Sequence, residues 1–165
     1  MSRIKREVPG PGQESVWDYP RPPLLRVGHE SIEIELGGQV VARTTTSWQV
    51  LETSHPPTYY LPRAAFAPGT LRPAAGHTVC EWKGRASYVD VVAGEVVAAR
   101  AGWFYPDPTP AFAALRDAIA VMPAGMDRCT VDGELVRAQE GGFYGGWITD
   151  RVVGPFKGSP GSWGW

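Results

Sequence analysis

The sequence contains no Asn, only 3 Lys beside 13 Arg, and only 2 Cys. Cys80 and Cys129 stand in no Cys-x-x-Cys pair, so the ligand spacing of a structural zinc site is missing and no metal is expected. The two thiols allow one disulfide, but two free thiols in a cytoplasmic protein are the favoured interpretation. No Gly-rich phosphate loop precedes a helix, and no cofactor is expected.

Long apolar runs are missing as well. No stretch approaches the roughly 18 apolar residues that a membrane-spanning helix needs, so no membrane association is expected. The basic start, Met1 to Arg6, is followed by no apolar segment, and no signal peptide is predicted. The formal net charge is −1, without the excess of cations that binding to duplex nucleic acid requires. A cytoplasmic protein is expected.

The 20 Gly and 16 Pro are too many for a helix bundle, and the local patterns predict a mainly β protein. Ile32, Ile34 and Leu36 alternate with two glutamates and are followed by Gly37-Gly38, which predicts a strand that enters a tight hairpin. Two further hairpins are predicted on the same grounds. The three predicted hairpins cover residues 32–46, 86–104 and 128–138.

Only one segment, Pro110 to Ala120, has helical spacing of its apolar residues. The overlapping segment Ala118 to Met122 is also compatible with a strand. Residues 1–23 contain several prolines and predict an extended N-terminal arm, with Trp17 and Tyr19 packed on the body of the protein. Residues 24–140 are expected to form a single β-rich core domain. Residues 141–165, rich in Gly and aromatics, predict a C-terminal arm laid over that core.

Three short segments combine polar and aromatic residues in a way that suits a binding site. Each has an ordinary structural interpretation too: a solvated glutamate, a lysine in a turn, and aromatics in the core. The candidate residues are Glu52, His55, Tyr60, Cys80, Trp82, Lys83, Trp103 and Tyr105.

These motifs occur in a fixed order that resembles the bacterial family called domain of unknown function 427. The resemblance extends from about Val27 to Gln139, and both terminal segments are similar to longer members. It rests on Glu52, Tyr60-Leu61-Pro62, Cys80, Lys83-Gly84, Ala86, Tyr88, Trp103, Tyr105 and Pro108. It implies a fold of the β-tent type with two packed antiparallel sheets, one short helix and extended terminal arms. The family sometimes carries a nucleotidyltransferase label, but no Gly-Ser in this sequence is followed by the Asp-x-Asp metal pair of such enzymes.

The resemblance favours one shared pocket for the candidate residues. Glu52 and Lys83 would compensate each other's buried charge, and the aromatic rings would provide flat walls. Such a pocket suits a small planar or cationic ligand. The expected ligand-binding residues are Glu52, Tyr60, Cys80, Trp82, Lys83, Trp103 and Tyr105. Alternatively, Glu52 and Lys83 form a structural ion pair and no ligand is bound.

Two other functions remain open at this stage. In the first, Cys80 is the nucleophile of an enzyme and a nearby His is its base. His55 is the better candidate for that base, because an extended strand would direct His77 and Cys80 to opposite faces. In the second, the aromatic arms bind a partner protein or another copy of the chain.

Overall fold

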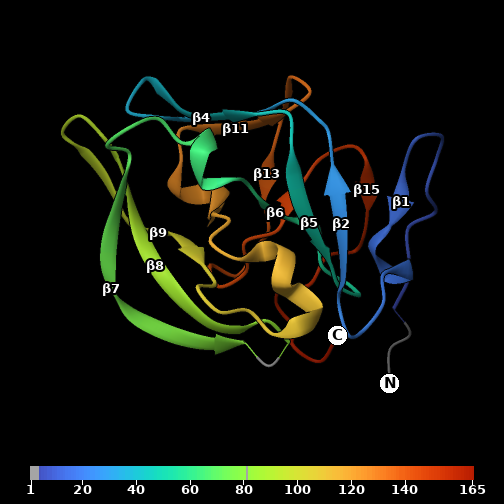
Figure 1. Ribbon diagram of the computed structural model, residues 1–165. Coiled ribbons are helices and arrows are strands. Elements are labelled where there is room, and N and C mark those ends of the chain that lie inside the picture. Colours follow the sequence, from blue (N-terminus) through green and yellow to red (C-terminus); the bar gives the residue numbers. More distant parts are fainter. Residues whose placement is uncertain (1–3, 81) are drawn as a thin grey trace.

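The computed structural model describes residues 4–80 and 82–165, and it consists mainly of β-strands, as expected (Figure 1). Within these residues, three antiparallel sheets form the body of the molecule. The first has the order β10-β9-β8-β7 and contains β7 (Leu71–Cys80), β8 (Gly84–Ala93), β9 (Val96–Phe104) and β10 (Ala120–Val121). The second has the order β12-β11-β3-β4 and contains β3 (Ile32–Leu36), β4 (Gln39–Thr44), β11 (Arg128–Val131) and β12 (Glu134–Leu135).

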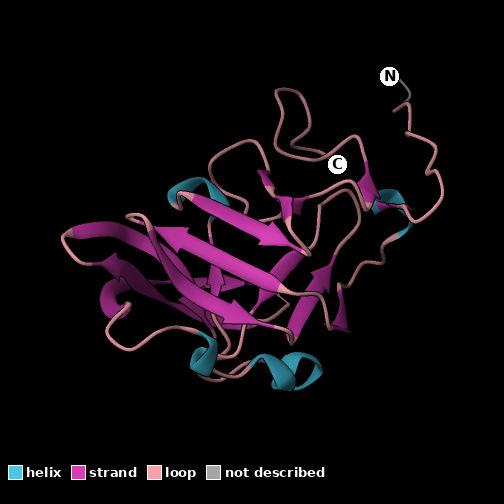
Figure 2. Cartoon of the chain, turned by 90° about the horizontal axis from the view of Figure 1, so that it is seen from above, coloured by secondary structure: helices cyan, strands magenta, loops and turns pink. Residues whose placement is uncertain are grey.

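A third sheet, with the order β2-β5-β6, stands beside the two that the resemblance implied. It contains β2 (Leu24–Gly28), β5 (Ser47–Leu51) and β6 (Thr58–Tyr60). Two short pairings join the terminal segments, namely β1 (Glu14–Ser15) with β15 (Val152–Val153), and β13 (Arg137–Ala138) with β14 (Trp147–Ile148). Figure 2 shows that the short helical segments lie at the margins of the strands. These segments are η1 (Val16–Asp18), η2 (Arg63–Ala65), η3 (Pro110–Leu115) and η4 (Pro123–Gly125).

The three predicted hairpins are confirmed as β3–β4, β8–β9 and β11–β12. Gly37 and Gly38 have φ values of 59° and 75°, and Asp132 and Gly133 have values of 50° and 82°. Positive φ at both central residues is the geometry of a type I′ turn, which matches the twist of the two flanking strands. Glycine adopts it without strain, so the turn residues alone determine where these strands reverse.

The alternating pattern of β3 places its apolar side chains in the core. Ile32 and Ile34 are fully buried and Leu36 nearly so, whereas the intervening glutamates remain partly exposed. The buried face packs on Val89 and Val91 of β8, so the first two sheets share one hydrophobic core. Each such side chain contributes roughly 1.5–3 kcal/mol by leaving water.

The predicted helix over Pro110 to Ala120 is shorter than expected. It is the 3-10 segment η3, which ends at Leu115, and the alternative of a strand is confirmed at Ala120–Val121. Asp117, with a positive φ of 59°, interrupts the helical path. Ile119 then exchanges two backbone hydrogen bonds of 2.8 Å with Leu61, which ties the third sheet to the first. No helix among the described residues is long and apolar enough to cross a membrane.

The two terminal segments pack on the body of the molecule and on each other. The first three residues of the predicted N-terminal arm lie outside the described residues. Val16 is fully buried beside β1, which pairs in parallel with β15 near the C-terminal end of the chain (Figure 1). Trp147 is also fully buried, and its ring stacks on Tyr59 at a centroid distance of 4.9 Å. Cys80 and Cys129 are free thiols, so the disulfide alternative is wrong.

Candidate functional site

The predicted aromatic residues come together where β6 meets the sheet of β8, β9 and β10. Trp103 and Tyr105 are two residues apart in an extended segment, so their side chains lie on one face, towards the fully buried Tyr60. The Tyr60 ring lies 6.4 Å from Trp103 in an edge-to-face arrangement and 6.2 Å from Tyr105. The Trp103 Nε1–H group donates a hydrogen bond of 3.1 Å to the Tyr60 hydroxyl. Three aromatic residues from two sheets therefore form one cluster.

Lys83 directs its ammonium group into this cluster. Its Nζ atom lies 5.8 Å from the centroid of the Tyr60 ring and 5.5 Å from that of Tyr105, within the range of cation–π attraction. It also donates a long hydrogen bond of 3.5 Å to the Tyr60 hydroxyl. Among the described residues, this is the only hydrogen bond of the Lys83 side chain, although an ammonium has three donors. The geometry leaves donor capacity available.

The local backbone explains why Lys83 occupies this place. Gly84 has a φ of 107°, and a Cβ atom at that position would lie 3.3 Å from the carbonyl oxygen of Asp107. Thr109 fastens the same turn, because its amide donates to the Lys83 carbonyl at 3.0 Å and its hydroxyl donates to the Trp82 carbonyl at 2.5 Å. Lys83 is thus held between the end of β7 and the segment that follows β9.

The cluster keeps Lys83 charged. Burial by itself lowers the pKa of a lysine, but the negative charges that Tyr60 and Cys80 carry when ionised, the hydrogen bond to the Tyr60 hydroxyl and the Glu52 carboxylate raise the pKa of Lys83 above its usual value. Burial is also the main cause that raises the pKa of Tyr105, with Tyr60 and Cys80 adding to it. At neutral pH the site therefore contains an ammonium ion beside a neutral phenol.

Glu52 acts on Lys83 through space and not through a direct ion pair. Its carboxylate forms an ion pair with the Arg21 guanidinium at 3.3 Å and also lies 3.8 Å from the His55 ring. Arg21 also donates to the backbone carbonyl of Thr53, which fixes the end of β5. The sequence predicted that Glu52 and Lys83 compensate each other's charge. In the structure Arg21 shares this role, because its guanidinium lies closest to the Glu52 carboxylate.

His55 and Cys80, the base and the nucleophile of the alternative enzyme, have different contacts in the structure. His55 is positioned by the Thr53 carbonyl at 2.9 Å and packs edge-on against the Tyr144 ring at 5.2 Å. Burial lowers the pKa of His55, so its imidazole is neutral at pH 7. Cys80 lies instead beside Lys83 and Tyr105, whose titrations it influences. In the described part of the chain, no cluster of three or more His, Cys, Asp or Glu side chains could hold a metal ion.

Sequence reasoning missed the contribution of the C-terminal segment to this site. A Cβ atom at Gly145 would lie 2.2 Å from Cη2 of Trp103, so the glycine backbone lies directly against the indole ring. Next to it, Tyr144 packs on His55 and receives the ammonium of Lys157 over its ring at 5.7 Å. The Gly-rich composition of the segment was the available signal, but the pattern did not indicate which ring it would meet.

Comparison with known proteins supports the family assignment. The family described as Domain of unknown function (DUF427) matches residues 24–132, which contain Lys83 and all three aromatic residues around it. No curated protein matches the chain. Two thirds of the chain lie within the match, including most of the three sheets. By this match and by the fixed order of its motifs, the chain belongs to the DUF427 family.

Proposed function

We propose that the protein binds a small planar ligand that carries a carboxylate or carbonyl oxygen, with that oxygen held by Lys83. The observation that supports this proposal is the charged ammonium with one long hydrogen bond of 3.5 Å. An ammonium placed among aromatic rings has lost much of its hydration, so it gains most from an oxygen acceptor.

The aromatic surroundings favour a flat molecule over other acceptors. Trp82 and Trp103 are only partly buried, unlike Tyr60 and Tyr105 at the base of the cluster. Partly exposed indole rings offer apolar faces on which a planar group can stack. Of the two ligand types expected from sequence, the planar type is therefore retained.

A cationic ligand has less support. The raised pKa of Lys83 keeps a positive charge in the site, and this charge repels a cation. The negative charge of Glu52 is already matched by Arg21 at its other side. These charges leave a local excess of positive charge beside the rings.

The test uses benzoate and benzamidine, two flat probes of equal shape and opposite charge, with the full-length protein. Benzoate is expected to bind with millimolar affinity and to shift the indole N–H signal of Trp103, whereas benzamidine is not. Lys83→Met keeps the length of the side chain and removes its charge, so benzoate affinity should fall about ten-fold or more. Binding should stay constant between pH 6 and 9, because the Lys83 pKa exceeds its ordinary value of 10.5.

Arg63→Met is the matched control, since Arg63 lies over the Phe104 ring at 4.6 Å outside this cluster. It should leave benzoate affinity unchanged. The proposal fails if benzoate does not bind, if benzamidine binds equally well, or if Lys83→Met retains the affinity of the parent protein.

Self-association is a second candidate function, supported by two exposed aromatics of the C-terminal segment. Phe143 is 76% exposed and Trp163 is 61% exposed, and both lie against Tyr144. Aromatic side chains that remain in contact with water are enriched at protein interfaces. Sedimentation velocity of the parent chain and of Phe143→Ser with Trp163→Ser tests this function. A concentration-dependent dimer that the double variant loses supports it, and a monomer in both cases excludes it.

A further inference from the structure

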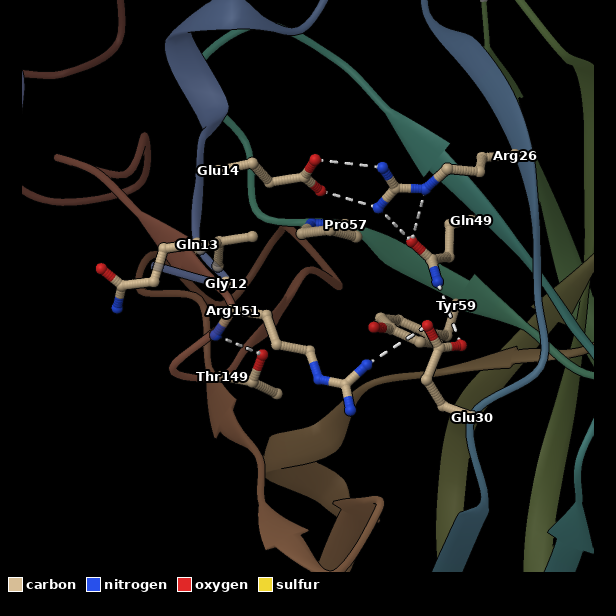
Figure 3. Close-up of a pocket in the computed structure, with 11 residues that line it drawn as sticks. Gly12, Gln13, Glu14, Arg26, Glu30, Gln49, Pro57, Tyr59, Thr149 and Arg151 are labelled. Carbon is tan, nitrogen blue, oxygen red and sulfur yellow. Dashed lines mark hydrogen bonds and ion pairs between the residues drawn. The ribbon is translucent and has the colours of Figure 1, made fainter. Parts of the chain in front are cut away.

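A second polar site lies on the other face of the third sheet from the Lys83 cluster, because Arg26, Gln49 and Tyr59 are cross-strand neighbours and the next residue of β6, Tyr60, points to the opposite face. It is a cavity of about 440 Å³ between β2, β5 and the two terminal segments (Figure 3). Glu14, Thr149 and Arg151 line it from outside the region that matches the family, and Arg26, Gln49 and Tyr59 line it from within. The cavity therefore exists because the terminal segments close over the sheet.

The charged groups of the cavity are joined in a continuous belt of hydrogen bonds (Figure 3). Arg26 donates to both oxygens of Glu14 at 3.1 and 2.7 Å, and also to Oε1 of Gln49 at 2.7 Å. Gln49 donates to Glu30 at 3.4 Å, and Arg151 donates to the other oxygen of Glu30 at 3.3 Å. The two guanidinium groups and two carboxylates give the lining no net charge, and Asp132 binds Arg151 from outside the lining.

Electrostatics keep this belt ionised. The hydrogen bonds from Arg26 are the largest cause that lowers the pKa of Glu14, and the same interaction raises the pKa of Arg26. Arg151 is held in addition by Asp132, to which it donates a short hydrogen bond. Each charge of the lining already has a partner, so a charged ligand finds no unpaired counter-ion there, and the cavity favours a neutral guest.

Hydrogen-bonding capacity nevertheless remains on both sides of the belt. A carboxylate has about four lone-pair sites, and the Glu30 carboxylate accepts two hydrogen bonds from the described residues. A guanidinium has five N–H donors, of which Arg151 uses two in its ion pairs. Acceptors and donors are thus available side by side, and a hydroxyl group of a ligand can serve both.

Tyr59 adds a hydroxyl to the lining. Its side chain is only 3% exposed, and burial raises the pKa of Tyr59 to about 12, so the phenol remains protonated and can donate. Among the described residues its hydroxyl has no hydrogen-bond partner, and its ring is fixed by stacking on Trp147. A phenol hydroxyl that faces a cavity without a protein partner is available to donate to a guest.

We infer that this cavity binds a neutral polyhydroxylated molecule of the size of a mono- or disaccharide. Sugar hydroxyls donate and accept at once, which matches a lining of paired charges with free donors and acceptors and no net charge. The volume lies within the usual range for small-ligand sites. This site is separate from the Lys83 cluster and does not depend on the function proposed there.

The test is saturation-transfer NMR on the full-length protein with glucose, galactose, ribose, maltose and trehalose, each at millimolar concentration. Glutamine and inorganic phosphate serve as zwitterionic and anionic comparison probes. At least one sugar is expected to bind, and Tyr59→Phe, which retains the stacked ring, should weaken it about 3- to 10-fold. Tyr88→Phe is the matched control, because the Tyr88 hydroxyl bonds to Thr78 outside the cavity, and it should leave binding unchanged.

A second variant tests the charge argument independently. Glu14→Gln keeps the shape of the side chain but removes the only carboxylate that pairs with Arg26 among the described residues, so phosphate binding should appear in this variant alone. The inference is overturned if no sugar binds, if Tyr59→Phe leaves sugar affinity unchanged, or if phosphate or glutamine binds the parent protein. In each of these cases, the belt serves to fasten the terminal segments.

Discussion

The Lys83 cluster and the cavity around Tyr59 treat charge in opposite ways. Lys83 is a single cation whose nearest neighbours are aromatic rings, and its carboxylate counterpart is engaged by Arg21. In the cavity every guanidinium faces a carboxylate, as in the pair of Arg26 and Glu14. Among the described residues no carboxylate forms a direct ion pair with Lys83, and such a cation selects an acceptor oxygen, whereas balanced ion pairs select a neutral partner. The balance of charge, more than the number of polar groups, determines which ligand each site can accept.

The two sites also rest on different parts of the chain. All the residues of the Lys83 cluster lie within the range that matches the family, and the C-terminal segment only covers Trp103 through Gly145. The cavity takes half its charged lining from the terminal segments. Variants that disturb one site and leave the other intact are therefore available, and they separate the two proposals.

The largest effect is expected from Trp147→Ala. This fully buried ring supports Tyr59 from behind, and its Nε1–H group donates to the Val121 carbonyl at 3.4 Å. Truncation of a buried aromatic should reduce the free energy of unfolding by about 3–5 kcal/mol. Sugar binding should be lost. The folded fraction of the same variant should still bind benzoate, because Trp147 is not part of the Lys83 cluster. Urea unfolding measures the stability, and the largely exposed Trp163→Ala should cost less than about 0.5 kcal/mol. Equal losses for both variants would contradict the assigned role of Trp147.

Gly145→Ala should damage the other site. Its new Cβ would lie 2.2 Å from Trp103, so the indole must tilt or the C-terminal segment must lift, at a cost of about 1–3 kcal/mol. The indole N–H signal of Trp103 should move and benzoate affinity should fall, with no change in sugar binding. At Gly164 a Cβ meets nothing within 4 Å, which makes Gly164→Ala the control. An unmoved Trp103 signal in Gly145→Ala would show that the segment does not rest on this ring.

Local sequence patterns predicted the hairpins well, because alternation and turn glycines act over a few residues. Gly37-Gly38 and Asp132-Gly133 adopt the expected positive φ values, and the strands on both sides follow. The end of the helix after Pro110 depended on a distant contact, since Leu61 pairs with Ile119 and draws the chain into a strand. The third sheet escaped prediction for the same reason: β2 and β5 pair across an intervening hairpin.

The two sites differ in how far sequence could reveal them. Tyr60, Lys83 and Trp103 stood in a recognisable order, and the structure brings them together. Their arrangement remained open because it depends on the turn at Gly84 and on Gly145. The cavity gave almost no signal, since Glu14 and Arg151 are ordinary charged residues that meet only after β1 pairs with β15. One clue was Gln49, a polar residue between Trp48 and Val50 in β5. Its amide side chain is nearly fully buried.

Arg26→Met tests the belt through its pH dependence. The pKa of Glu14 is lowered below its usual value of 4.5 in the folded state, so the pair stabilises the protein above that pH and loses its effect as the pH falls through the folded pKa. Both side chains are about two-fifths exposed, at 41% and 39%, and screening limits the expected loss to about 1 kcal/mol at pH 7.

The difference between parent and variant should shrink between pH 7 and pH 3.5, as measured by urea unfolding. Arg43→Met removes an exposed pair with Glu33 and should cost less than about 0.5 kcal/mol at either pH. A loss in Arg26→Met that does not change with pH would assign its effect to the hydrogen bonds with Gln49 alone.

The smallest expected effect is on the rate at which the two cysteine thiols react with a disulfide reagent. This rate reports whether a ligand occupies the Lys83 cluster. Burial raises the pKa of Cys129 to about 12, and its side chain is 2% exposed, so a disulfide reagent should not reach it in the native protein. Cys80 is partly exposed and lies beside Lys83 and Tyr105, so one thiol should react in the native state and the second only after unfolding. Saturating benzoate should slow the reaction of Cys80 a few-fold by covering it, and glucose should not. Cys80 belongs to the Lys83 cluster and not to the cavity. If glucose slowed the reaction of Cys80 and benzoate did not, the sugar would be assigned to the Lys83 cluster and the proposed sites of the two ligands would be wrong.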